Sequence, residues 1–228
     1  VTLPVADGGD GMLEALSGVL GATTISIEAH DPLGRTIWAS YAIHDDMAII
    51  EMAQVSGLAL LRGNERNPML TSSYGLGEVM LNALDRGARR IILGIGGSAT
   101  NDCGMGMLSA LGYMFYDAEG EVLEPSGEAM CRVASIDSSV ADPRLCECEI
   151  VVASDVDNPL YGKQGAAWVY AQQKGATHTM IDALDEGMRR FSEVVGGEYH
   201  MAAGAGAAGG VGYALIAFCG ARLMPGIE

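Results

Sequence analysis

The sequence predicts a mixed α/β fold, with mixed sheets flanked by helices and residues 1–228 in a single domain. Segments 23–29, 36–43 and 47–52 alternate between apolar and polar side chains, as half-buried strands do. Residues 180–195 instead repeat apolar side chains every three or four positions, which is typical of an amphipathic helix. Hydrophobic residues make up 49% of the 228 positions, which is enough for a substantial core and excludes general disorder.

In the N-terminal half, turn residues bound each expected element. A helix at 12–20 ends at a glycine, and an Asp-Pro-Leu-Gly turn at 31–34 joins the first two strands. We expect these two strands and the third to form an antiparallel meander. Thr and Ser at 71–73 cap a further helix, which stops at a glycine and leads into a strand at 89–95.

The C-terminal half begins with a glycine-rich turn and then alternates short helices, strands and loops. The expected elements there are a helix at 104–111, a hairpin of 113–116 with 121–123, a strand at 149–153, a polar loop at 154–174, the amphipathic helix and a buried helix at 205–219. The order of strands and helices supports an α/β fold rather than an all-α or all-β one.

Composition excludes several classes of partner. The net charge of −16 argues against a nucleic-acid or anionic-membrane surface, because both need basic patches. No apolar run is long enough to span a bilayer. Lys163 and Lys174 are the two lysines of the chain, so any positive field for a phosphate must be local. Five irregularly spaced cysteines favour reduced thiols in a cytoplasmic protein over a disulfide framework.

The most informative segment is 94–106, Gly-Ile-Gly-Gly-Ser-Ala-Thr-Asn-Asp-Cys-Gly-Met-Gly, between an apolar strand and a helix. Its small residues let a ligand approach the backbone, and free amides at a helix start attract anions. Ser98, Thr100, Asn101 and Asp102 add four polar side chains in five positions. The turn is therefore a candidate site for a phosphate or carboxylate group.

A second interpretation of this turn is a dinucleotide-binding fingerprint. Gly94, Gly96 and Ala99 fit its spacing, and Asp117 follows roughly 20 residues on. In that fold, however, the helix begins inside the fingerprint, and residues 100–104 include Asn, Asp and Gly, which are poor helix formers. A longer loop with a role in an active site fits the segment better.

Two further clusters carry carboxylates. Asp7 and Asp10 lie in Asp-Gly-Gly-Asp-Gly before a helix, which fits either a magnesium or substrate site or an acidic turn favoured by the helix dipole. Asp155 and Asn158 follow a strand, where ligand sites of α/β proteins gather, and the segment lacks the pattern of a calcium-binding EF-hand. Lys174 is either a point charge for a phosphate or a solvated surface residue.

Taken together, these segments resemble the type I glycerate kinase family, and their order and spacing run through nearly the whole chain. The matching segments are PVADGGDG (4–11), DPLGR (31–35), TSSYGLGE (71–78), GIGGSATNDCGMGMLSALG (94–112), SDVDNPLYGKQGAA (154–167), QKGA (173–176) and GAGAAGGVGYAL (204–215). Three positions depart from the family's pattern: Cys103 replaces the usual Gly, and Gln172 and Ala203 replace common prolines.

The resemblance implies an ATP-dependent kinase that phosphorylates D-glycerate to a phosphoglycerate with Mg²⁺. It also implies a two-lobed α/β enzyme with its active site in the cleft, where one lobe is Rossmann-like and is assembled from both chain ends. This chain resembles the lobe inserted between those ends. We therefore expect the remainder of a longer chain as its partner, and little activity from this part alone.

The positions of the polar clusters at strand ends and helix starts predict the site residues. Asn101 and Asp102 would orient the glycerate hydroxyls or the metal, and Asp7 and Asp10 would bind Mg²⁺ or accept the proton of the attacking hydroxyl. These four are the predicted catalytic residues. The predicted binding residues are Gly96, Gly97, Ser98 and Thr100 for a phosphate or carboxylate, Thr71, Ser72 and Ser73 for a second anionic group, and Asp155, Asn158 and Lys174 for the facing wall.

Two other functions remain open on the sequence alone. A nicotinamide-dependent oxidoreductase would use the turn that contains Gly94, Gly96 and Ala99. A non-catalytic lobe would bind a small acid without turnover. The sequence also leaves open which glycerate hydroxyl would be phosphorylated, because that depends on the pose of the substrate.

Overall fold

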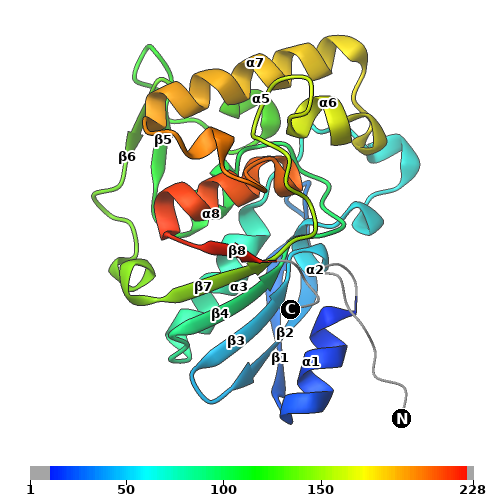
Figure 1. The fold of residues 1–228 in the computed structure, drawn as a ribbon, viewed down its shortest axis with the longest axis vertical. Helices are drawn as coiled ribbons and strands as arrows, with labels where there is room; N and C mark the ends of the chain where they lie inside the picture. The colour runs from blue at the N-terminus through cyan, green and yellow to red at the C-terminus, as the bar shows by residue number, and fades with distance from the viewer. Residues whose placement is uncertain (1–10, 225–228) are drawn as a thin grey trace.

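The computed structural model describes residues 11–224 and contains a mixed six-stranded sheet, with strand order β1-β2-β3-β4-β7-β8 (Figure 1). The strands β1, β2 and β3 pair antiparallel, and β3, β4, β7 and β8 pair parallel. A separate two-stranded antiparallel sheet consists of β5 and β6. The strand bounds are β1 Thr23–His30, β2 Thr36–His44, β3 Met47–Glu51, β4 Arg90–Gly94, β5 Met114–Tyr116, β6 Ser135–Asp137, β7 Glu149–Ala153 and β8 Arg222–Met224.

The helices lie on both faces of the main sheet, and most of them lie on one face. Their bounds are α1 Met12–Leu20, α2 Ala53–Ser56, α3 Tyr74–Asp85, α4 Met105–Ala110, α5 Gly127–Met130, α6 Ala166–Tyr170, α7 His178–Val195 and α8 Val211–Cys219. Within residues 11–224, six 3₁₀ turns lie at Leu58–Leu60, Gly63–Glu65, Pro143–Glu147, Gln172–Lys174, Tyr199–Met201 and Ala207–Gly210. The mixed α/β class and the antiparallel meander of the first three strands are both confirmed.

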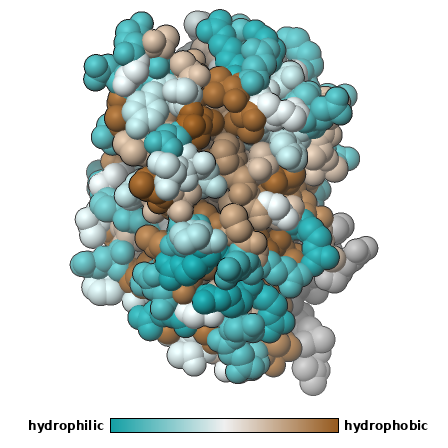
Figure 2. All heavy atoms as spheres, turned by 90° about the vertical axis from the view of Figure 1, so that its left-hand side faces the viewer, coloured by the Kyte–Doolittle hydropathy of each residue, from teal (hydrophilic) through white to brown (hydrophobic). Residues whose placement is uncertain are grey.

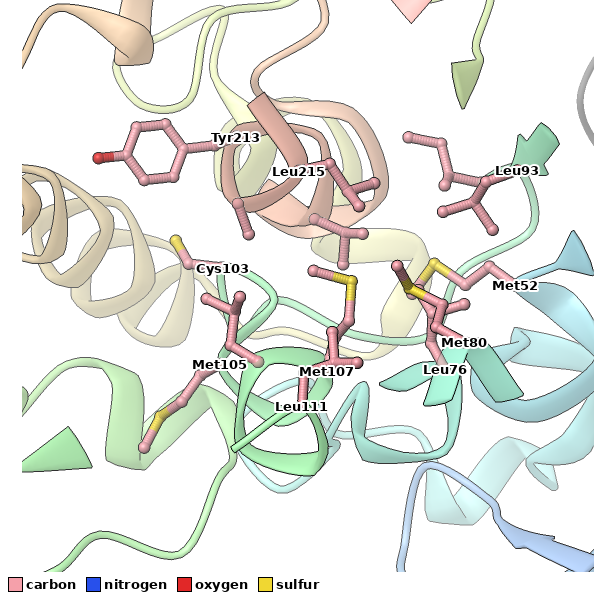
Figure 3. Packing of buried hydrophobic residues seen from close by; sticks show 14 of the residues in the cluster. Met52, Leu76, Met80, Leu93, Cys103, Met105, Met107, Leu111, Tyr213 and Leu215 are labelled. Carbon is pink, nitrogen blue, oxygen red and sulfur yellow. The ribbon is translucent and has the colours of Figure 1, made fainter. Parts of the chain in front are cut away.

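The main hydrophobic core lies between the sheet and the layer that α3, α4 and α8 form. In Figure 3, Met107 of α4 lies between Leu215 of α8 and Leu111, with Leu76 and Met80 of α3 beside them. All five side chains are at most 1% exposed. On the opposite face, α1 covers a smaller cluster that includes Ala42 and Ile49. Because β3 is covered on both faces, its apolar residues run almost continuously.

The amphipathic helix predicted at 180–195 is α7, which starts two residues earlier. The side chain of Thr177 accepts a hydrogen bond from the Met180 amide and caps the helix. Ile181, Leu184, Met188 and Phe191 form its buried face. This helix forms the outer layer at the top of Figure 1, and α8 lies between it and the sheet.

Two expected elements are different in the structure. The predicted hairpin of 113–116 with 121–123 is reduced to a single bridge between Tyr116 and Val122, and β5 pairs instead with β6, about 20 residues further along the chain. The predicted helix at 205–219 begins only at Val211. The residues before it form a 3₁₀ turn in which Ala208, Gly209 and Gly210 all have positive φ, which an α-helix cannot accommodate.

Gly209 shows why this turn needs glycine. Its φ is +68°, and an added Cβ would lie 1.9 Å from the carbonyl oxygen of Thr100. We expect Gly209→Ala to lower the free energy of unfolding by about 3 kcal/mol, measured as a lower midpoint in denaturant unfolding. The control is Gly220→Ala, because Gly220 has a similar φ of +63° and no atom within 4 Å of the added Cβ. That variant is expected to cost about 1 kcal/mol, and equal losses in the two variants would contradict the steric argument.

The surface in Figure 2 has apolar residues in a central belt, with hydrophilic atoms above and below it. Among residues 11–224, none of the helices has the length and apolar character needed to cross a membrane.

Candidate active site

A cleft of about 400 Å³ opens at the carboxyl ends of β4 and β7. This is the edge of a parallel sheet at which ligands of α/β proteins bind. Its lining residues come from the end of β7 and the turns after both strands, from α6, and from three 3₁₀ turns. They are Leu58, Ile95, Gly96, Gly97, Ser98, Ala153, Ser154, Asp155, Val156, Tyr170, Gln173, Lys174, Ala207 and Ala208.

One wall of the cleft is the backbone of Gly96, Gly97 and Ser98. The carbonyl of Gly97 accepts a hydrogen bond from the Leu58 amide at 2.8 Å, and Gly97 itself has a φ of +69°. In residues 11–224, the amides of these three wall residues donate no backbone hydrogen bond. Peptide N–H groups on a glycine-rich turn can therefore meet an anion in the cleft.

Lys174 is the last residue of a 3₁₀ turn and is the one lysine that lines the cleft. The residue is only 2% exposed, and its Nζ donates to Ser98 Oγ at 2.9 Å and to the Thr100 carbonyl at 2.7 Å. Both of these hydrogen-bond partners are neutral oxygens. Burial lowers the pKa of Lys174 from 10.5 to about 7, and the negative charge of Asp102 acts against that shift. An anion that entered the cleft would stabilise the protonated amine.

Asp102 lies beneath the cleft and is fully buried. Its Oδ2 accepts hydrogen bonds from the Ser73 amide and hydroxyl, both at 2.8 Å, and from the Gly106 amide at 3.1 Å. Its Oδ1 accepts a bond from the Gly104 amide at 3.2 Å. Burial raises the pKa of Asp102, and these four donors oppose that shift. The carboxylate thereby joins the starts of α3 and α4, whose dipoles favour a negative charge.

Three neighbours of Asp102 are also buried. The Thr71 hydroxyl donates to the Ala99 carbonyl at 3.0 Å, so it supports the turn from below. Within the part of the chain that the structure describes, the Thr100 hydroxyl and both polar atoms of the Asn101 side chain have no hydrogen-bond partner. The two unpartnered side chains are completely buried and do not line the cleft.

The structure therefore divides the predicted site residues into separate groups. Gly96, Gly97, Ser98, Asp155 and Lys174 line the cleft, while Thr71, Ser73, Thr100, Asn101 and Asp102 are buried below it. Asn101 and Asp102 were predicted to contact the substrate directly, and this stays a prediction. Their burial below the cleft does not favour such a contact.

The other predicted residues do not line the cleft or lie outside the described range. The Ser72 hydroxyl accepts from the Tyr74 amide, and Asn158 receives a hydrogen bond from the Tyr170 hydroxyl at 2.6 Å. Through that bond, Asn158 positions a cleft-lining side chain. The predicted metal ligands Asp7 and Asp10 lie outside residues 11–224.

Sequence reasoning missed several of the apolar and polar wall residues. Tyr170 and Gln173 lie in the segment expected to be a polar loop, where the structure has α6 and a 3₁₀ turn. Leu58 and Val156 add apolar surface. The nearness of Tyr170 to the matching segments at 154–167 and 173–176 is the one signal that could have indicated it.

The dinucleotide interpretation does not fit the geometry. Helix α4 begins at Met105, so the whole polar cluster lies in a loop, as the composition of 100–104 predicts. Asp117, the candidate ribose ligand, lies in a surface turn and accepts from the amides of Glu119 and Glu121. It is absent from the cleft lining. The side chain of Cys103 also lies away from the cleft, on the side of Tyr213 (Figure 3).

The cleft has few side chains that could bind a magnesium ion. Residues 11–224 contain no group of three His, Cys, Asp or Glu side chains placed to hold a metal. Asp155 is the cleft-lining carboxylate within that range. Since Mg²⁺ binds through one or two carboxylates plus phosphate oxygens, Asp155 fits as a ligand that shares the ion with a bound phosphate.

The chain is similar to several known proteins. Over 99% of this chain, the sequence is 46% identical to the glycerate kinase of Halalkalibacterium halodurans. Over all of this chain, it is 47% identical to the glycerate 2-kinase of Escherichia coli. It also resembles the crystal structure of a protein assigned as glycerate kinase 2 from Salmonella typhimurium LT2, with a TM-score of 0.96 and 46% identity. That likeness covers 99% of this chain and 62% of the solved one.

The chain spans 61% of the length of each of the two named relatives. The sequence profile described as the glycerate kinase family matches residues 1–228. The chain therefore belongs to the glycerate kinase family.

Proposed function

We propose that this chain forms part of an ATP-dependent kinase that phosphorylates D-glycerate to a phosphoglycerate. Membership of the glycerate kinase family supports the reaction class and the small hydroxy-acid substrate. The observation that carries the proposal is the pairing of the Lys174 amine with the exposed backbone of Gly96 and Gly97 in one cleft. A buried cation and a row of peptide amides are suited to an anionic group, such as a phosphate or the glycerate carboxylate.

The cleft residues would contribute positioning and charge neutralisation, which are the main needs of phosphoryl transfer. Lys174 would hold one anionic oxygen, and the amides of Gly96 to Ser98 would hold others. Asp155 would hold Mg²⁺, which supplies further neutralisation of the phosphate charge when bound. Tyr170, Leu58 and Val156 would exclude water from one side of the cleft.

The remaining roles follow from the sequence and are part of the same proposal. Asp7 and Asp10 are candidates for Mg²⁺ binding or for accepting the proton of the attacking hydroxyl. Because the chain spans 61% of the curated relatives it matches, we propose that a longer chain supplies the rest of the site. The five free cysteines support a cytoplasmic protein.

A coupled assay of ADP release tests the proposal directly. With D-glycerate, ATP and Mg²⁺, we expect turnover from the full-length protein and little or none from residues 1–228 alone. Titration with NAD(H) should give no saturable binding to either. Full-length protein that binds D-glycerate but releases no ADP would contradict the kinase proposal and favour a lobe that only binds a small acid.

A further inference from the structure

We propose that Asp102 is a positioning residue of the phosphoryl-transfer site, a buried carboxylate that joins two helix starts and sustains the positive charge of Lys174 from beneath the cleft. This inference rests on the proposed function for its kinetic consequences. It assigns Asp102 an indirect role in place of the direct contact with substrate or metal that the sequence suggests.

The geometry shows why Asp102 acts through other groups. The carboxylate is 0% exposed, and four donors from Ser73, Gly104 and Gly106 occupy it. The Ser73 hydroxyl is fixed in turn, because it accepts a bond from the Met107 amide at 3.0 Å. An incoming substrate would have to break this network to reach the carboxylate. All four groups donate, which is the environment of an ionised, acceptor-only carboxylate.

The same network connects Asp102 to Lys174 through a short stretch of backbone. Lys174 Nζ is held by Ser98 and by the carbonyl of Thr100, two residues before Asp102. The 3₁₀ turn that contains Gly209 holds the same stretch of backbone in place, because the Cys103 amide donates to the Gly209 carbonyl at 3.1 Å. The two side chains are thus buried charges on opposite sides of one rigid turn, with no direct ion pair between them.

The other groups around Lys174 leave Asp102 as the main buried counter-charge. On the open side, Asp155 and Tyr170 line the cleft, and Asp155 is exposed to solvent, which screens its charge. Next to Lys174, Gly175 packs against the backbone of Arg66. Beside Asp102, burial raises the pKa of the Cys103 thiol well above its usual range, so that it stays neutral.

The burial of Lys174 gives this arrangement a functional consequence. An amine without a counter-charge would lose its proton below neutral pH, because a low-dielectric site disfavours the charged form. The negative charge of Asp102 opposes the lowering of the Lys174 pKa, which stays at about 7. Loss of that charge would lower the pKa further and would weaken the hold of the cleft on an anion at neutral pH.

The test compares Asp102→Asn with Ser73→Ala in the full-length protein. Asp102→Asn removes the charge, and we expect the pH above which kcat/KM for D-glycerate falls to move down by about one unit. The loss in kcat/KM should then grow from about twofold at pH 6 to about tenfold at pH 8. Ser73→Ala removes one hydrogen bond to Asp102 but keeps the charge. It should therefore lower stability and leave unchanged the pH above which kcat/KM falls. A loss that is equal at all pH values in Asp102→Asn would overturn the proposal.

A second measurement needs no variant and covers the case in which Asp102→Asn fails to fold. In the full-length wild-type protein, NMR can follow the Asp102 carboxyl carbon and the Lys174 Cε through a pH titration. We expect Asp102 to be ionised at pH 7 and above while Lys174 titrates near 7. A protonated Asp102 at pH 7 would overturn the proposal. Because this titration needs no turnover, it also distinguishes failure of the inference from failure of the proposed kinase activity.

Discussion

Lys174→Met is expected to lower kcat/KM for D-glycerate by about a thousandfold in the full-length protein, with the fold intact. The amine is the one lysine charge of the cleft, and the oxygens that accept its hydrogen bonds lie on the same turn as the amides of Gly96 and Gly97. Methionine fills a similar volume but donates no hydrogen bond and carries no charge. The coupled ADP-release assay at saturating Mg²⁺ and ATP measures the loss.

The second lysine of the chain provides the matched control. Lys163 is exposed, and its amine lies 3.2 Å from the centre of the Trp168 ring, away from the cleft lining. Lys163→Met makes the same chemical change and should keep kcat/KM within about twofold of the wild type. If Lys174→Met kept more than about a tenth of the wild-type value, an anion-binding role for this amine would be untenable.

A second large effect is expected on the pH dependence of stability. The pKa of Lys174 is about 7 in the folded protein and near 10.5 when the chain is unfolded. Between these values the unfolded state binds the extra proton, so the contribution of Lys174 to the free energy of unfolding is fully present above pH 10.5. This contribution to stability is lost as the pH falls from 10.5 toward 7. The total loss in the free energy of unfolding is on the order of a few kcal/mol. In Lys174→Met this slope should be absent.

Denaturant unfolding at a series of pH values between 7 and 10 measures this slope. Buried thiols and phenols with raised pKa, such as Cys103, Cys131 and Tyr213, have the opposite effect on stability in the same range. The difference curve between the variant and the wild type isolates Lys174, because these groups are common to both. The Lys163→Met curve should run parallel to that of the wild type, whereas a parallel Lys174→Met curve would show that the amine is not buried in solution.

Local patterns in the sequence were sufficient for most of the fold. The alternation in 23–52 predicted three strands that are present as β1 to β3, and the periodic segment predicted as a helix at 180–195 is α7. The errors arose where the deciding interaction is distant in sequence. The pairing of β5 with β6 is non-local, and in the turn with positive φ values Gly209 packs against Thr100 and Gly210 against Cys103.

For the candidate site, the sequence indicated the turn but not which side chains face the cleft. Ser98 and Lys174 line it, while Asn101 and Asp102 on the same turn are fully buried. All four are polar residues near glycines, so residue type alone could not separate them. The direction of each side chain depends on the hydrogen bonds to Ser73 and on the turn around Gly209, which only the folded chain brings together.

The most direct test of the anion site is the pKa of Lys174 with and without a bound anion. NMR of the Lys174 Cε in the full-length protein, titrated with inorganic phosphate or D-glycerate, reports both the binding and the ionisation of this side chain. We expect the pKa to rise from about 7 by at least about one unit when the cleft is saturated, since a nearby anion favours the charged amine. An unchanged pKa and an unchanged Lys174 signal at ligand concentrations that support turnover would contradict the assignment of the cleft as the site of phosphoryl transfer.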